Sequence, residues 1–221
     1  MAFGGVIFDW DGVVINSASL HEKSWELLAN ELGLDLPEDH FSLGFGKKNE
    51  VIIPEILKWT QNKEQILMWG KRKEELYREQ GRTEGIPILN GVRPLLLSLA
   101  TARIPCVIGT STEKGNLSLA FEQLKIGHFF SGSVCSEDVT HGKPDPEVFL
   151  KAARIINQPP ENCVVLEDST HGIEAAISGG MKALGLSTTR TETELFLSGA
   201  NKVVTDPSIV NISLLKSLFV N

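Results

Sequence analysis

Three short apolar runs, each ending abruptly in polar residues, constrain the fold of this chain most strongly. They lie at residues 6–8, 105–110 and 164–166. Runs of this length, rich in Val and Ile and apolar on both faces, are typical of strands buried between two layers of helices. Helical patterns separate most of them, which predicts right-handed βαβ units and a parallel sheet. Weaker strand candidates lie at residues 132–136, 182–186 and 202–205.

A long stretch without strand patterns interrupts this rhythm. Between the first and second apolar runs, residues from about 14 to 91 carry helical patterns only. A helical stretch of about seventy residues far exceeds the usual length of a connection, so we expect a small helical module inserted after the first strand. The predicted division is a core of residues 1–15 and 91–221 and a helical cap of residues 16–90.

Composition places the chain among ordinary globular proteins. Of the 221 residues, 42% are apolar and 22% are charged, which argues against disorder. The formal net charge is −7, and a surface of this sign repels the phosphate backbone of nucleic acids. The three cysteines lie in apolar stretches without the spacing of metal ligands, which predicts buried, reduced thiols.

The amino-terminal segment shows no sign of targeting. It has neither a basic region nor a long apolar run before its first acidic residues, so neither a signal peptide nor a membrane span is predicted. Together with reduced cysteines, this predicts a soluble, cytoplasmic protein that binds no membrane. No sequence pattern indicates a protein partner.

Polar side chains gather at the ends of the three strand candidates. Because ligands of open α/β sheets bind at the carboxyl ends of the strands, these side chains form the candidate site. Four carboxylates at one edge repel one another strongly, and Mg²⁺, a hard cation that prefers oxygen ligands, relieves such repulsion. Lys143 adds a positive charge. It precedes a predicted helix that has Asp145 as its N-cap and Pro146 as its first residue. The polar residues at the strand ends are Asp9, Asp11, Thr110, Ser111, Glu167 and Asp168.

This set of residues suits phosphoryl transfer, because a transferred phosphoryl group spreads negative charge that a metal and a lysine can neutralise. A carboxylate can attack phosphorus and form an aspartyl-phosphate. A second carboxyl can protonate the leaving oxygen and then accept a proton from water. Asp9 and Asp11, two residues apart, are suited to these roles, and Gly12 lets the backbone turn tightly past the site.

Four motifs follow one another along the chain: Asp9-Trp10-Asp11-Gly12-Val13, Thr110, Gly142-Lys143-Pro144-Asp145-Pro146, and Glu167-Asp168-Ser169 with Gly172-Ile173. In this order they resemble the motifs of the haloacid dehalogenase-like superfamily. The resemblance covers nearly the whole chain, and the combination is far more specific than any one motif. It implies a Rossmann-like α/β core, with a helical cap inserted just after the first motif.

The same resemblance implies roles for the site residues. Asp9 is then the nucleophile and Asp11 the general acid/base. Mg²⁺ is held by Asp9, the backbone carbonyl of Asp11 and Asp168, with Glu167 close by or coordinating. Thr110 hydrogen-bonds the phosphoryl group and Lys143 neutralises it. The carboxyl group at Asp11 favours phosphoester chemistry over dehalogenation.

Within the superfamily, the chain resembles the β-phosphoglucomutase-like group and its sugar-phosphatase relatives. If this chain is like the mutases, His21 helps to align the acid/base carboxyl and Lys73 lies near the substrate. Trp25 either contacts the substrate or packs in the core of the cap. The match rests on residues 21–25, on Lys71-Arg72-Lys73 followed by Tyr77, and on Thr110-Ser111-Thr112. The predicted substrate-binding residues are His21, Trp25, Lys47, Lys73, Ser111 and Thr112.

One departure from the mutases concerns the second phosphate. Where the mutases carry an arginine that clamps it, the nearest match is Lys47, a point charge without the planar bidentate fork of arginine. We therefore expect a Mg²⁺-dependent phosphomonoester hydrolase acting on a small phosphorylated metabolite, such as a sugar phosphate. The alternatives are a hexose-phosphate mutase of the β-phosphoglucomutase type and a catalytically idle binding or regulatory protein, against which the complete carboxylate set argues.

Overall fold

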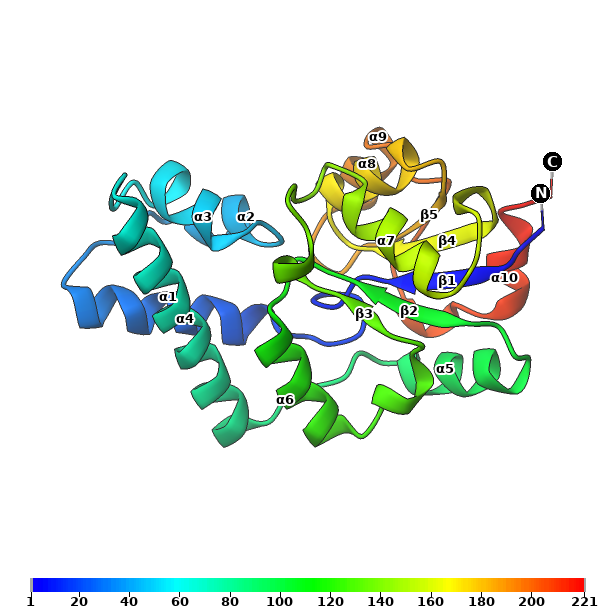
Figure 1. Cartoon of the computed structure of the whole chain (residues 1–221), viewed down its shortest axis with the longest axis horizontal. Helices are drawn as coiled ribbons and strands as arrows, with labels where there is room; N and C mark the ends of the chain where they lie inside the picture. Colours follow the sequence, from blue (N-terminus) through cyan, green and yellow to red (C-terminus); the bar gives the residue numbers. More distant parts are fainter. Residues whose placement is uncertain (1, 221) are drawn as a thin grey trace.

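The computed structural model describes residues 2–220 and contains a parallel sheet with helices on both faces (Figure 1). The strand order is β3-β2-β1-β4-β5-β6, so β1 lies between β2 and β4. Ile7 of β1 is opposite Val107 of β2 and Val165 of β4. The strands are β1 (Gly5–Phe8), β2 (Cys106–Gly109), β3 (Ser133–Val134), β4 (Cys163–Glu167), β5 (Lys182–Leu186) and β6 (Lys202–Val204). All six strand predictions and the predicted α/β fold are confirmed.

Helices connect these strands and form the cap. Six belong to the part of the chain that follows the cap: α5 (Val92–Thr101), α6 (Lys114–Leu124), α7 (Glu147–Ile155), α8 (Thr170–Ser178), α9 (Glu192–Leu197) and α10 (Ile212–Ser217). The cap contains α1 (Ala18–Leu32), α2 (His40–Gly44), α3 (Asn49–Val51), a π-helical turn (Ile52–Ile56) and α4 (Lys63–Glu84). Short 3₁₀ turns lie at Gly127–Phe129, Ser136–Asp138, Pro160–Asn162 and Pro207–Ile209.

The alternation of side chains along β1 creates two apolar cores. Phe8 packs with residues of α5, α6 and α10 on one face, whereas Ile7 packs with residues of α7, α8 and α9 on the other. Both side chains are fully buried. A strand that is apolar on both faces is therefore required at the centre of this sheet.

The cap has an apolar cluster of its own, in which Trp25 and Leu28 of α1 pack with Leu76 of α4. Figure 1 shows α1 to α4 beyond the carboxyl ends of the strands, to the left of the sheet. The connections into and out of the cap lie side by side, because Asn16 N–H donates to the carbonyl of Pro87 over 2.8 Å. The domain limits at 15/16 and 90/91 stay a prediction.

Several local predictions are confirmed with small shifts. The helix predicted to begin at Pro146 begins at Glu147, whose N–H donates to Oδ1 of Asp145 over 2.9 Å. The three cysteines are free and buried, as predicted. Among the described residues, no helix combines the length and apolar character needed to cross a membrane. The cytoplasmic location stays a prediction.

Candidate active site

The first strand ends at the centre of the sheet edge, between two neighbours, where ligands bind in open α/β sheets. The N–H of Asp9 donates to the carbonyl of Leu166 over 3.0 Å, which holds Asp9 against the end of β4. The chain then turns sharply at Gly12, whose φ is +74°. A Cβ atom at Gly12 would overlap the carboxylate of Asp168, so a larger residue would displace part of the site.

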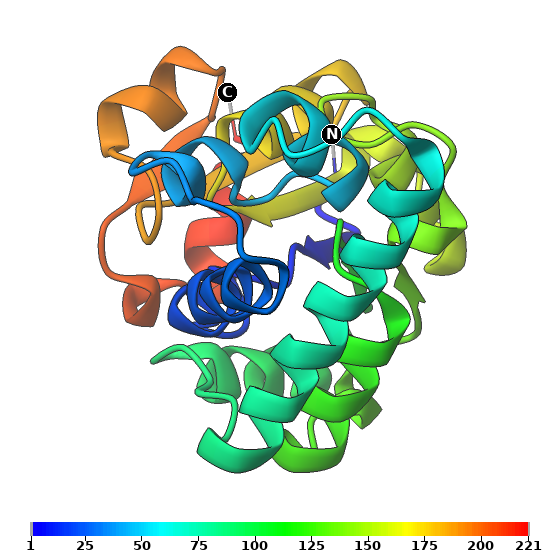
Figure 2. The same cartoon turned by 90° about the vertical axis from the view of Figure 1, so that its left-hand side faces the viewer.

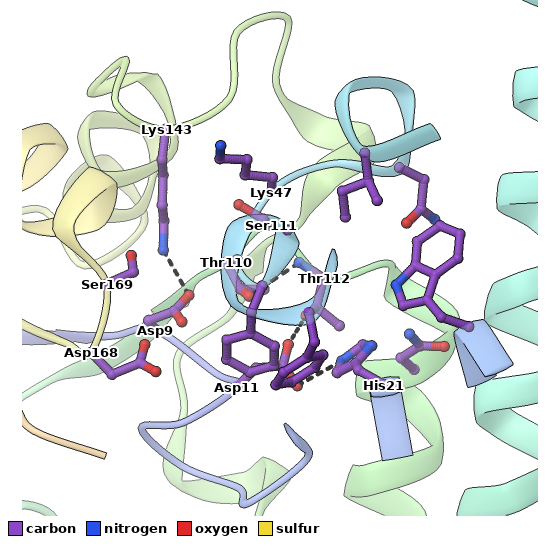
Figure 3. A pocket seen from close by; sticks show the side chains of 18 of the residues that line it. Asp9, Asp11, His21, Lys47, Thr110, Ser111, Thr112, Lys143, Asp168 and Ser169 are labelled. Carbon is purple, nitrogen blue, oxygen red and sulfur yellow. Dashed lines mark hydrogen bonds and ion pairs between the residues drawn. The ribbon is translucent and has the colours of Figure 1, made fainter. Parts of the chain in front are cut away.

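All the predicted site residues line one pocket between the cap and the carboxyl ends of the strands (Figure 3). The core contributes Asp9, Asp11, Thr110, Ser111, Thr112, Lys143, Glu167 and Asp168. The cap contributes His21, Trp25, Lys47 and Lys73. The fold thus brings together residues that are spread over most of the sequence, although their roles stay predictions.

Lys143 provides the positive charge next to Asp9. Its Nζ donates to Oδ1 of Asp9 over 2.8 Å and to Oε1 of Glu167 over 2.5 Å. It also lies over the ring of Phe149, 4.8 Å from the ring centroid. Burial lowers the pKa of Lys143, but Asp9 and Glu167 outweigh burial and raise the pKa overall, so Lys143 stays charged.

The neighbouring carboxyl groups carry surplus negative charge. Asp9, Glu167 and Asp168 are buried and offer oxygen atoms that all lie within 4.8 Å of one another. Burial raises the pKa of Asp9, Lys143 opposes this effect and Glu167 adds to it, so that the pKa is about 7. Burial, followed by the charges of Glu167 and Asp9, raises the pKa of Asp168 well above its usual value. Such a cluster favours a bound cation.

The free oxygen atoms of this cluster fit a divalent metal. Among the described residues, neither Oδ2 of Asp9 nor Oδ1 of Asp168 has a hydrogen-bond donor. Thr189 Oγ1 donates to the other oxygen of Asp168 over 2.5 Å and so orients that carboxylate. Glu167 differs, because Lys143 occupies Oε1 while the N–H groups of Asp168 and Ser169 donate to Oε2 over 2.6 and 2.7 Å.

Asp11 has different surroundings from Asp9. Ser17 Oγ donates to its Oδ1 over 2.5 Å, His21 Nε2 lies 3.2 Å from the same oxygen, and Thr112 Oγ1 donates to Oδ2. Burial raises the pKa of Asp11, but His21 and these hydrogen bonds outweigh burial and lower the pKa to about 2. Asp11 is therefore ionised in this arrangement of its neighbours. Figure 3 shows the contacts with His21 and Thr112.

The contact with His21 continues into the cap. Lys73 Nζ lies 2.6 Å from Nδ1 of His21. An ammonium group can only donate, so Nδ1 accepts and Nε2 carries the proton that is donated to Asp11. Tyr77 stacks on the imidazole with a centroid separation of 4.3 Å. Lys73 lines the pocket and is buried, with only 2% of its surface exposed.

The other predicted residues occupy the walls of the pocket. Thr110 is buried, and its Oγ1 accepts a hydrogen bond of 3.1 Å from the N–H of Thr112. Lys47 lines the pocket from the cap and has no carboxylate partner among the described residues. Trp25 both lines the pocket and packs in the apolar cluster of the cap, so its two predicted placements coexist.

Sequence reasoning missed several polar residues of the pocket and its support. Ser17 and Thr189 hold Asp11 and Asp168, and nothing in their local sequence distinguishes them from ordinary loop hydroxyls. A polar network between the cap and the core was also missed, and it is formed by Asn49, Glu74 and Asn116. Glu74 follows Lys73 in a charged helix, and only the period of 3.6 residues relative to the apolar positions could have indicated its burial.

Comparisons with known proteins agree with this geometry. A 5-amino-6-(5-phospho-D-ribitylamino)uracil phosphatase, chloroplastic, from Arabidopsis thaliana is 37% identical over 187 residues, which are 83% of this chain and 49% of the relative. The chain thus spans about half the length of that relative. The β-phosphoglucomutase of Bacillus subtilis is 30% identical over 217 residues, which are 95% of this chain and 92% of the relative.

A solved structure and a sequence profile extend this result. A HAD hydrolase, family IA, variant 3, from Entamoeba histolytica has a TM-score of 0.89 and 28% identity, covering 99% of this chain and 100% of that chain. The profile of haloacid dehalogenase-like hydrolases matches residues 6–186, which include every motif singled out in the sequence. The chain therefore belongs to the haloacid dehalogenase-like hydrolase family, in its β-phosphoglucomutase-like group.

Proposed function

We propose that this protein is a phosphomonoester hydrolase that acts on a small phosphorylated metabolite through a phosphorylated Asp9. The observation that carries the proposal is the contact of Asp9 with Lys143, with the Asp168 carboxylate beside it at the sheet edge. The carboxylate of Asp9 is the nucleophile, and Lys143 supplies positive charge for the transferred group. The named relative from Arabidopsis thaliana is itself a phosphatase, which supports the same class of reaction.

Two steps account for the roles of the two aspartates. In the first, Asp9 attacks phosphorus, the bond to the leaving oxygen breaks, and that oxygen takes a proton from Asp11. In the second, Asp11 takes a proton from water while the water oxygen attacks phosphorus, and the bond between phosphorus and Asp9 breaks. Asp11 thus regains its proton and phosphate is released. Before the first step, Asp11 leaves its donors Ser17 and Thr112, which hold its pKa low, and takes up a proton from solvent. This is the proton that passes to the leaving oxygen.

We propose Mg²⁺ as the metal of this site. Asp9 and Asp168, which have free oxygens, would hold it together with the backbone carbonyl of Asp11, and Glu167 would lie beside it. When bound, Mg²⁺ supplies positive charge that offsets the carboxylates and the phosphoryl oxygens. The hydroxyl group of Thr110, which follows β2, would donate a hydrogen bond to the phosphoryl group.

A second candidate function is that of a hexose-phosphate mutase, because Lys47 is a cation available in the pocket for a second phosphate. The single charge of Lys47 lacks the bidentate geometry with which arginine holds a phosphate. A mutase must retain a bisphosphate intermediate while it reverses its orientation. We therefore favour hydrolysis, for which water needs only to reach the phosphorylated Asp9.

The test follows free phosphate and isomerised product together. The purified protein is incubated with Mg²⁺ and a panel of sugar and polyol phosphates, p-nitrophenyl phosphate, and β-glucose 1-phosphate with and without a bisphosphate primer. Release of phosphate without isomer formation is expected. Primer-dependent isomer formation with little phosphate would establish the mutase instead, and absence of turnover on every ester would contradict both.

A further inference from the structure

Glu74 is a buried carboxylate in the cap that the reaction described above does not use. It lies on α4 and is 5% exposed. Its Oε1 accepts hydrogen bonds from Asn49 Nδ2 over 2.8 Å and from Lys73 Nζ over 3.0 Å. Its Oε2 accepts from Asn116 Nδ2 over 2.5 Å. Glu74 lines the pocket, but donors occupy both of its oxygens, so it is suited to support its neighbours.

Among the described residues, Glu74 is the only carboxylate that forms an ion pair with Lys73. The Lys73 side chain is only 3% exposed, so its ammonium group has lost most of its hydration. A buried charge without a partner is unfavourable, so the carboxylate of Glu74 stabilises the ammonium group of Lys73. Burial raises the pKa of Glu74, but Lys73 and then His21 outweigh burial and lower it to about 2, which keeps Glu74 charged.

The charge of Lys73 decides which nitrogen of His21 carries a proton. An ammonium group at 2.6 Å donates to Nδ1 and leaves Nε2–H facing Asp11. A neutral amine can instead accept a hydrogen bond from Nδ1–H, which would present the lone pair of Nε2 to the Asp11 carboxylate. The first arrangement attracts Asp11 and the second repels it.

The aromatic rings around Lys73 restrict the other directions that its ammonium group could take. Nζ lies 5.3 Å from the ring centroid of Trp25 and 5.7 Å from that of Tyr77. Both rings are buried. The ammonium group is thus held between two ring faces, Glu74 and His21, which makes the contact with His21 well defined.

We propose that Glu74 is a positioning residue that, through Lys73 and His21, holds the proton-transferring carboxyl group of Asp11 in its working orientation. This inference rests on the proposed function, in which Asp11 protonates the leaving oxygen. It assigns Glu74 no contact with substrate. The path Glu74–Lys73–His21–Asp11 is continuous, with donor–acceptor distances of 3.0, 2.6 and 3.2 Å.

A structural role of Glu74 is the competing explanation. Asn116, which donates to Glu74, belongs to α6 of the core, and Figure 2 shows α4 and α6 side by side. Glu74 therefore also joins the cap to the core. A purely structural role would affect all substrates equally, whereas a positioning role would affect those whose leaving oxygen needs a proton.

The test uses two esters of similar shape, phenyl phosphate and p-nitrophenyl phosphate. Phenolate is the more basic leaving group and depends more on protonation by Asp11. We expect Glu74→Gln to lower kcat/KM for phenyl phosphate about tenfold, because protonation by a positioned acid contributes strongly to such a step. For p-nitrophenyl phosphate we expect a loss of about twofold or less. An equal loss with both esters, or no loss, would overturn the proposal.

The matched control is Glu75→Gln, which removes a carboxylate from the adjacent position of α4. Glu75 is partly exposed and lies 3.5 Å from Arg72, away from His21. Glu75→Gln should leave kcat/KM for both esters unchanged. Asn116→Ala is the second variant, which also serves if Glu74→Gln does not fold; it removes one donor to Glu74 and should give a smaller loss selective for phenyl phosphate. Absence of wild-type activity on both esters would instead contradict the proposed function.

Discussion

Lys143 and Asp9 are separated by 134 residues in the sequence, yet Nζ of Lys143 lies 2.8 Å from Oδ1 of Asp9. The contact joins the end of the central strand β1 to the loop before α7. Lys143 is also bonded to Glu167 at the end of β4, so one ammonium group connects two neighbouring strands of the sheet. The orientation of the proposed nucleophile depends on this lysine.

Replacing this lysine tests that dependence. Lys143→Met should lower kcat at least about a hundredfold, because it removes positive charge from the transition state of phosphoryl transfer. It should also lower the Tm, since Asp9 and Glu167 lose their buried cation. Steady-state kinetics and thermal unfolding measure the two effects. Lys151→Met, which affects a partly exposed ion pair, is the control and should retain activity; equal activity of the two variants would contradict the role of Lys143.

The metal site makes a prediction that does not depend on turnover. Mg²⁺ should raise the Tm of the protein, because a ligand that binds only the folded state stabilises it by mass action. Asp168→Asn should reduce this increase, since it removes one of the two carboxylates with a free oxygen. Thermal unfolding over a MgCl₂ titration provides the measurement. Asp39→Asn, a change in the exposed part of the cap, should keep the full increase. A full increase in Asp168→Asn would place the metal elsewhere.

Two leucines of the cap test whether its apolar cluster contributes to folding. Leu28 is fully buried among the cap residues, whereas Leu67 on α4 is 62% exposed. Leu28→Ala should lower the free energy of unfolding by about 2–5 kcal/mol, the usual cost of such a cavity. Leu67→Ala should change it by about 0.5 kcal/mol or less. Denaturant unfolding measures both values, and similar losses would show that the buried cluster has no special weight.

Glu74 should make stability depend on pH. Its pKa in the folded protein, about 2, is lower than the ordinary value of 4.5 that applies to the unfolded chain. Its contribution to stability is therefore fully present above about pH 4.5 and is lost as the pH falls toward about 2. The difference in Tm between the wild type and Glu74→Gln should be larger at about pH 6 than at about pH 3.5. A constant difference across this range would contradict the assigned pKa.

The sequence predicted the sheet and the core side of the site well, for a local reason. At Asp9 and Asp168, an apolar strand run ends directly in the functional residue, so position along the strand specifies position at the sheet edge. The two apolar faces follow from the same short patterns, whereas the strand order was not predicted. No interaction between distant residues had to be inferred first.

The cap side was less predictable because neighbouring residues of one charged helix have different surroundings. Arg72 is partly exposed and pairs with Glu31, whereas the next residue, Lys73, is buried beside His21. Successive residues differ by about 100° around a helix, and the direction of the core is set by tertiary packing. The adjacent Glu74 was missed for the same reason, and its partner Asn116 lies in a different part of the sequence.

The central claim is that Asp9 carries the phosphoryl group during turnover. Acid quenching of the enzyme during turnover of p-nitrophenyl phosphate, followed by peptide mapping by mass spectrometry, detects this intermediate. We predict one phosphoryl group on Asp9, accumulating in Asp11→Asn, whose second step lacks its base, and absent from an inactive Asp9→Asn. Phosphate release by Asp9→Asn at the wild-type rate, or a phosphoryl group on another residue, would contradict the account.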